Sequence, residues 1–143
     1  MLLVGTACAL LVVLTTVLHY EVLRGLNAGL PGLRVAARGK LLLVILAAFS
    51  AHAVEIVLYA FALWMLALYG GVGHLGEAGR FTFNTALYFS AETYTTLGYG
   101  DVVPAGDLRL LAGVEALNGL LLIGWSASYV YIAMERFWRE GSR

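Results

Sequence analysis

The sequence predicts an all-α membrane protein with three transmembrane helices and one shorter helix, on three observations. Of the 143 residues, 61% are hydrophobic and 13% are charged, whereas soluble domains are about 45–50% apolar and about 25% charged. Three apolar runs are each near or above the roughly 20 residues that cross a bilayer as a helix. Most charged residues lie between or after these runs. Membrane lipid is therefore the expected solvent.

The first apolar run, residues 2–18, is short for a span. It begins Met1-Leu2-Leu3-Val4 without a basic region, and nothing that resembles a small-x-small cleavage site precedes His19. A signal peptide normally has both features. We therefore expect residues 1–19 to form a retained first transmembrane helix, and a cleaved signal peptide is the alternative.

Basic residues predict which side of the membrane each segment faces. Residues 20–40 form a basic linker whose Gly-Leu-Pro-Gly stretch, 29–32, prevents one continuous helix. Seven of the nine basic residues lie in this linker and in the tail, 135–143: Arg24, Arg34, Arg38, Lys40, Arg136, Arg139 and Arg143. With three spans, both segments share one side, which the positive-inside rule makes cytoplasmic. The N-terminus is then expected outside and the C-terminus inside the cell membrane.

Two further spans, 41–69 and 108–134, enclose a segment of unusual character. Residues 70–81 are rich in glycine and predict an external loop. Residues 82–95 predict a helix too short to span, with Thr82 or Asn84 as its cap. The glycine-rich stretch 96–101 cannot continue that helix comfortably. A half-helix followed by irregular backbone predicts a re-entrant loop, which is tolerated at membrane depth only inside protein or along a water path.

The sequence Tyr88-Phe89-Ser90-Ala91-Glu92-Thr93-Tyr94-Thr95-Thr96-Leu97-Gly98-Tyr99-Gly100-Asp101-Val102-Val103-Pro104 resembles the pore helix and selectivity filter of potassium channels, above all the small prokaryotic ones. The resemblance implies tetrameric channel architecture with a pore domain over 41–143. Its parts would be an outer helix (41–69), a turret (70–81), a pore helix (82–95), a filter (96–101), an inner helix (108–134) and a short cytoplasmic tail (135–143). It also implies a potassium-selective channel subunit with passive conduction, K⁺ as the permeant ion and no cofactor.

The resemblance implies that K⁺ binds to backbone carbonyls of Thr96, Leu97, Gly98 and Tyr99 and to the Thr96 hydroxyl, which replace the hydration shell of the ion. Gly98 and Gly100 allow the unusual backbone conformations that such a filter needs. The Tyr99 side chain would brace the loop against the pore helix. One chain offers one loop, so four identical chains around a fourfold axis are expected, as a homotetramer.

Four residues are expected to support the filter: Glu92, Asp101, Tyr88 and Phe89. By resemblance, Glu92 and Asp101 share a proton behind the filter, because two close carboxyls cannot both ionise easily. The alternative is that each carboxyl hydrogen-bonds locally. Tyr88 and Phe89 stand where the family often has two tryptophans, and Phe89 has no hydrogen-bond donor. Leu97 stands where valine is commonest.

Four polar residues lie within the spans in two pairs with the same spacing, His52 with Glu55 and Glu115 with Asn118. Residues three apart share one helical face, and ionisable groups inside a membrane are functional candidates. A proton-sensing gate at His52 and Glu55 and a neutral set of hydrogen bonds between helices are both open interpretations. Asn118 could instead line a cavity below the filter.

Gly119 and Gly124 in the third span are either gating hinges, because glycine loosens a helix, or points of close packing. No span carries a ladder of Arg or Lys, so a voltage sensor of the usual kind is not expected. The zero formal net charge argues against nucleic acid as a partner.

Two other functions compete with conduction. One is a non-conducting or regulatory pore-type subunit. The other is a membrane enzyme that uses His52, Glu55 and Glu115, with or without a metal ion. The chain contains no HExxH motif and no serine nucleophile with a readable base partner. We therefore expect that the protein is not an enzyme.

Overall fold

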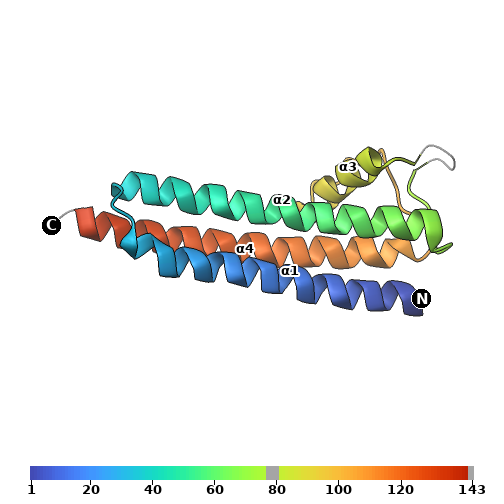
Figure 1. The fold of residues 1–143 in the computed structure, drawn as a ribbon. Helices are drawn as coiled ribbons and strands as arrows, with labels where there is room; N and C mark the ends of the chain where they lie inside the picture. The colour runs from blue at the N-terminus through green and yellow to red at the C-terminus, as the bar shows by residue number, and fades with distance from the viewer. Residues whose placement is uncertain (77–80, 142–143) are drawn as a thin grey trace.

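The computed structural model describes residues 1–76 and 81–141, and their fold is helical apart from one isolated β-bridge (Figure 1). The elements are α1 (Leu2–Gly29), a 3₁₀ turn η1 (Leu30–Gly32), α2 (Ala37–Tyr69), α3 (Phe83–Tyr94) and α4 (Leu108–Gly141). Three segments, Leu2–Gly32, Ala37–Tyr69 and Leu108–Arg139, are long and apolar enough to cross a membrane. The prediction of an all-α membrane protein with three such helices is confirmed.

The three long helices lie side by side, and short α3 packs beside α2 at one end (Figure 1). The N-terminus lies at the end that holds α3, and the C-terminus lies at the opposite end. Predicted segments that include 77–80 or 142–143, in the turret and in the tail, fall partly outside the described residues.

The long helices extend beyond the apolar runs that revealed them. α1 continues ten residues past the expected end at His19, to Gly29, and α4 continues past residue 134 to Gly141. The added part of α1 is amphipathic, because Leu23 is buried while Glu21 and Arg24 are exposed and paired with each other. A run of apolar residues marks the part of a helix that lipid surrounds. An amphipathic end has too many polar residues to extend that run, so hydropathy alone does not predict it.

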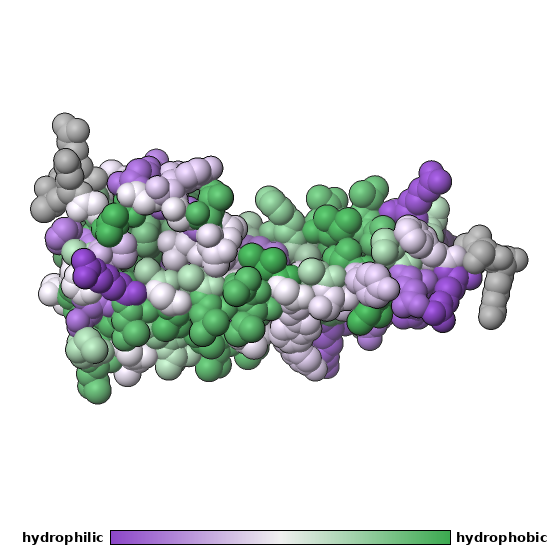
Figure 2. All heavy atoms as spheres, turned by 180° about the vertical axis from the view of Figure 1, so that it is seen from behind, coloured by the Kyte–Doolittle hydropathy of each residue, from purple (hydrophilic) through white to green (hydrophobic). Residues whose placement is uncertain are grey.

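Apolar side chains cover much of the outer surface of the long helices, and hydrophilic ones gather near the end that holds the C-terminus (Figure 2). Leu10, Phe49 and Ile132, from three different helices, are among the exposed apolar residues. Exposed apolar area on this scale suits lipid or a partner subunit rather than water.

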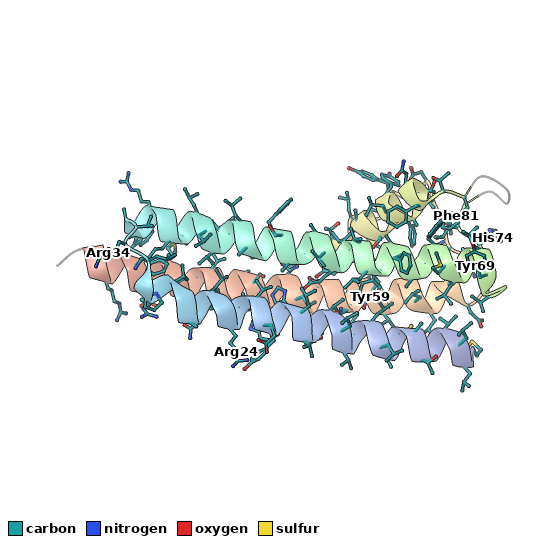
Figure 3. The ribbon with its side chains drawn as sticks, in the orientation of Figure 1. Arg24, Arg34, Tyr59, Tyr69, His74 and Phe81 are labelled. Atoms are coloured by element: carbon teal, nitrogen blue, oxygen red, sulfur yellow. The ribbon has the colours of Figure 1, made fainter. Side chains whose placement is uncertain are left out.

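At the α3 end, two connecting segments pair with each other. Gly76 N–H donates to Val103 O (3.0 Å), Ala105 N–H donates to His74 O (2.9 Å), and the chain forms a bridge between Leu75 and Pro104. Figure 3 shows Tyr69, His74 and Phe81 at this end and Arg34 at the opposite end. The pairing attaches the stretch after residue 101 to the loop after α2, so it fixes the C-terminal end of the segment 96–101.

α3 begins at the cap that the sequence predicts. The Thr82 side chain accepts a hydrogen bond from Thr85 N–H (3.3 Å), as an N-cap residue does. At its other end, Tyr94 is fully buried in a core shared with Tyr59 and Leu63 of α2 and Leu111 of α4. This core fixes the position from which the segment 96–101 departs.

Candidate functional site

Glu92 of α3 binds three successive backbone N–H groups of the segment 96–101. Its carbonyl oxygen accepts from Leu97 N–H (2.8 Å) and Gly98 N–H (3.3 Å). Its carboxylate Oε2 accepts from Tyr99 N–H (2.9 Å). These three peptide units therefore present their donors to the C-terminal end of α3.

The same contacts determine where the carbonyls point. In a planar trans peptide, C=O and N–H point in opposite directions, and none of the described peptide bonds is cis. The carbonyls of Thr96, Leu97 and Gly98 therefore point away from α3. Residues 95–100 are all exposed in the single chain, so these oxygens face an open side of the molecule.

Every second residue of the segment has a left-handed backbone. The φ angles are +59° at Thr96, +59° at Gly98 and +81° at Gly100. Glycine adopts such angles freely, which agrees with the expectation for Gly98 and Gly100. Thr96 was not expected to do so, and a left-handed threonine is strained. Such alternation of backbone conformation lets successive N–H groups converge on one side.

The four expected support residues do not form one connected set but make separate contacts near the segment 96–101. The Tyr88 hydroxyl lies 3.1–3.2 Å from both carboxylate oxygens of Asp101 and donates to that carboxylate. Desolvation and this hydrogen bond raise the pKa of Tyr88 above its ordinary value. Phe89 is buried in the core. Among the described residues, no hydrogen bond joins Glu92 to Asp101, so each carboxylate has a partner of its own.

The side chains of the segment make few contacts with their own chain. Tyr99 is 69% exposed and Leu97 is 58% exposed. The expected packing of Tyr99 against α3 is therefore slight within a single chain.

His52 and Glu55 belong to a buried polar cluster that joins all four helices. Glu55 accepts from His19 Nδ1 (2.9 Å), from His52 Nδ1 (3.0 Å) and from the Tyr94 hydroxyl. The Nε2 atoms of both histidines lie 3.1 Å from Ser126 Oγ. The structure thus places His52 and Glu55 in hydrogen bonds between helices.

The two residues of the second pair, Glu115 and Asn118, have different hydrogen-bond partners. The Ser90 hydroxyl of α3 contacts Glu115. Asn118 Nδ2 donates to Thr15 Oγ1 (2.7 Å) and to the Tyr59 hydroxyl (3.1 Å), and Asn118 is buried. In the single chain, Asn118 therefore links α4 to α1 and α2 and does not line an open cavity.

The two glycines of α4 differ in their surroundings. A Cβ on Gly119 would lie 2.2 Å from the Tyr94 carbonyl oxygen and 2.9 Å from its ring carbon Cγ. A Cβ on Gly124 would meet nothing within 4 Å. Close packing accounts for Gly119, and the hinge interpretation stays a prediction for Gly124.

Sequence reasoning missed His19, Ser126 and Tyr94 as members of the buried cluster. His19 was placed at the end of a helix, where a histidine is unremarkable, because the first helix was expected to stop there. In α1, which extends to Gly29, His19 lies in the interior and is fully buried. The spacing of the buried residues Val4, Cys8, Leu11, Thr15, His19 and Leu23 is the signal that includes it.

Comparisons with known proteins identify the class. A family model described as ion channel matches residues 40–136, about two thirds of the chain, so the chain belongs to this family. The three curated relatives that it resembles are described as potassium channels. Ion channels are not enzymes, so the expectation of a non-enzyme is confirmed and the enzyme interpretation of His52, Glu55 and Glu115 is set aside.

Three relatives illustrate the match. The inward rectifier potassium channel Kirbac3.1 of Paramagnetospirillum magnetotacticum is 40% identical over 77 residues, 53% of this chain and 25% of that protein. The calcium-gated potassium channel TvoK of Thermoplasma volcanium is 40% identical over 60 residues, 40% of this chain and 17% of its own. Two pore potassium channel b of Oryza sativa subsp. japonica is 38% identical over 60 residues, which are 41% of this chain and 17% of that protein. The chain spans a quarter or less of these relatives, and no solved structure matches it with comparable significance.

Proposed function

We propose that this chain is one subunit of a potassium-selective homotetrameric channel that conducts K⁺ passively through its backbone carbonyls. The observation that carries the proposal is the binding of three successive N–H groups by Glu92, which turns the carbonyls of Thr96, Leu97 and Gly98 to the open side. Four such loops around an axis replace the hydration shell of K⁺ with oxygens. Tyr99 O and the Thr96 hydroxyl complete the proposed ion sites.

The exposed faces of the loop support the tetramer. A conducting filter must be enclosed by protein, yet residues 95–100 are uncovered in the single chain. A neighbouring subunit would enclose them, and it would also cover the Tyr99 ring, which its own α3 leaves exposed. In this assembly α3 is the pore helix, α2 the outer helix and α4 the inner helix. No cofactor other than the permeant ion is needed.

The proposed orientation follows from charge. Arg34, in the turn between α1 and α2, lies at the end of the bundle opposite His74 (Figure 3). The C-terminus lies at the Arg34 end (Figures 1 and 3). The positive-inside rule places that end in the cytoplasm and α3, with the filter and the N-terminus, outside. In this orientation the segment 96–101 re-enters the membrane from the outer surface.

Ion flux into liposomes tests the proposal directly. The purified chain alone should take up K⁺, or Rb⁺ as its tracer, down a gradient at least about tenfold faster than Na⁺, because a tenfold preference requires only about 1.4 kcal/mol. Equal K⁺ and Na⁺ uptake would contradict potassium selectivity. A well-folded tetramer without any flux would instead identify the non-conducting subunit as the correct interpretation.

Substitution of Glu92 separates its hydrogen bond to the filter from a proton shared with Asp101. Glu92→Ala removes the acceptor of Tyr99 N–H. In the proposed tetramer neighbouring subunits would cover this N–H, and an unpaired buried donor costs about 1–3 kcal/mol. We expect K⁺ currents in planar bilayers to decay several-fold faster. Glu92→Gln keeps an acceptor oxygen and is expected to decay at nearly the wild-type rate. If the glutamine variant decays as fast as the alanine variant, the acidic group itself matters and the shared proton is favoured.

A further inference from the structure

The buried cluster contains a closed ring of four hydrogen-bonding contacts. Glu55 Oε1 contacts His19 Nδ1, His19 Nε2 contacts Ser126 Oγ, Ser126 Oγ contacts His52 Nε2, and His52 Nδ1 returns to Glu55 Oε2. The distances are 2.9–3.1 Å, within the ordinary range for hydrogen bonds. His19, Glu55 and Ser126 are buried, and the His52 side chain is 17% exposed. The ring joins α1, α2 and α4.

A count of protons shows that this ring is incomplete with ordinary protonation. Each of the four contacts needs one hydrogen. A neutral imidazole carries one, the Ser126 hydroxyl carries one, and a carboxylate carries none. The two histidines and the serine together therefore supply three hydrogens. The Tyr94 hydroxyl lies 3.0 Å from His52 Nδ1 as well, but its one proton is donated to Glu55 Oε2 from outside the ring. It therefore adds no hydrogen to the contact between His52 and Glu55.

We propose that the ring of His19, His52, Glu55 and Ser126 binds one additional proton, shared by the two imidazoles, and that this proton attaches α1 to the pore module. With four hydrogens, every contact is a hydrogen bond. The cluster is then also electrically neutral, because one imidazolium balances one carboxylate. Without the proton, a buried negative charge and a contact between two lone pairs would both remain, and each is costly away from water.

The proton belongs on a histidine rather than on Glu55. The Glu55 carboxylate accepts from His19, His52 and Tyr94, and a carboxylate that accepts several hydrogen bonds is stabilised in its charged form. The other titratable groups that interact with this region are Tyr59 of α2 and Glu115 of α4, which act electrostatically on Tyr94. From α4, the residue in direct contact with the imidazoles is Ser126, which stays neutral, and from α3 it is Tyr94.

The same residues are also possible ligands of a metal ion. One ligand atom from each of His19, His52 and Glu55 lies within 4.8 Å of the others, and two imidazoles with a carboxylate suit zinc. However, each of the four ring nitrogens already faces an oxygen at hydrogen-bond distance. A metal would have to displace these contacts, so a proton fits the observed geometry better.

The additional proton affects both the attachment of α1 and the support of the segment 96–101. The proton completes the hydrogen bonds of His19 to Glu55 of α2 and to Ser126 of α4, which are its only side-chain hydrogen bonds among the described residues. It also stabilises the Glu55 carboxylate, which accepts from Tyr94, two residues before Thr96. In the proposal the folded ring holds one whole proton, whereas the two imidazoles of the unfolded chain together hold about half of one at neutral pH. Stability therefore falls as pH rises through the release of this proton.

Nitrogen-15 NMR of the full chain in lipid bilayers measures the proton directly. The background variant His74→Gln removes the one other histidine, which lies in a connecting loop. At neutral pH we expect three of the four imidazole nitrogens of His19 and His52 to be protonated, and two of four after titration to alkaline pH. Two protonated nitrogens throughout the neutral and acidic range would overturn the proposal. So would stoichiometric zinc in the purified protein together with metal-bound nitrogen shifts.

Serine variants test the count itself. Ser126→Ala removes two of the four contacts, and two neutral imidazoles then supply both hydrogens that the contacts to Glu55 need. We expect the additional proton to be released at a lower pH in Ser126→Ala than in the wild type, because the hydrogen-bond deficit is gone and only charge balance with Glu55 still favours the proton. In Ser126→Thr it should be held as in the wild type. Ser128→Ala, which changes an exposed serine on the same helix, is the matched control and should retain it. An imidazolium that persists unchanged in Ser126→Ala would overturn the count. None of these measurements requires that the protein conduct ions.

Discussion

Replacement of Gly98 by alanine is expected to abolish potassium flux. Gly98 has φ of +59°, and a Cβ there would meet no atom of the same chain within 4 Å. The penalty is therefore conformational, about 1–2 kcal/mol for an L-residue in the left-handed region. Four subunits would add this to about 4–8 kcal/mol per channel, enough to turn the Gly98 peptide over. The peptide in question joins Leu97 to Gly98, so the Leu97 carbonyl would leave the pore, and ⁸⁶Rb⁺ uptake into liposomes should fall at least about tenfold.

Gly124→Ala is the matched control for this loss. It adds the same methyl group in a helix, again with no atom within 4 Å and without a left-handed φ. Unless Gly124 is a gating hinge, it should conduct like the wild type, and Gly25→Ala in α1, which has the same surroundings and no proposed role in the pore, should do so in either case. A Gly98→Ala channel with unchanged uptake and unchanged K⁺ over Na⁺ selectivity would show that the carbonyls of 96–98 are not the ion ligands.

Gly119→Ala is expected to produce the largest loss of stability among the glycine variants. The new Cβ would lie 2.2 Å from the backbone oxygen of Tyr94, far inside contact distance, and a backbone oxygen cannot move aside as a side chain can. Overpacking of this kind costs about 1–3 kcal/mol. At roughly 2–4 °C per kcal/mol for a chain of this size, the apparent melting temperature of the purified protein in detergent should fall by several degrees.

Gly113→Ala provides the comparison, since it lies in the same helix with nothing within 4 Å of the added carbon. It should melt within about a degree of the wild type, because exposed substitutions usually change stability by less than about 0.5 kcal/mol. If Gly119→Ala melts normally but changes the open time of single channels, Gly119 acts as a hinge, and the packing explanation is wrong.

The helices were predictable from sequence because apolar length and glycine punctuation report directly on lipid contact and backbone freedom. The short helix before Gly98 was expected over 82–95 and is observed as Phe83–Tyr94, with Thr82 as its cap. The ends of α1 and α4 were not predictable in the same way. Beyond residue 19 and residue 134 the helices become amphipathic, and there tertiary packing decides whether a helix continues.

The candidate site was only partly predictable for a similar reason. Gly98 and Gly100 predict an unusual backbone conformation by their residue type alone. The left-handed backbone of Thr96 and the three hydrogen bonds that Glu92 accepts depend instead on how α3 is oriented. His52 and Glu55 were found by their spacing on one helix. Their partners His19 and Ser126 come from other helices, and a spacing rule cannot detect contacts between elements that are distant in sequence.

The attachment of three peptide units to Glu92 also determines how the proposed row of ion sites would respond to a movement of α3. Because one residue holds all three, a small rotation of α3 would carry the carbonyls of Thr96, Leu97 and Gly98 together as a rigid unit. Neighbouring ion positions would then be created or destroyed in concert. Occupancy measured across a range of K⁺ concentrations should accordingly change in one cooperative step, with no partly formed intermediate.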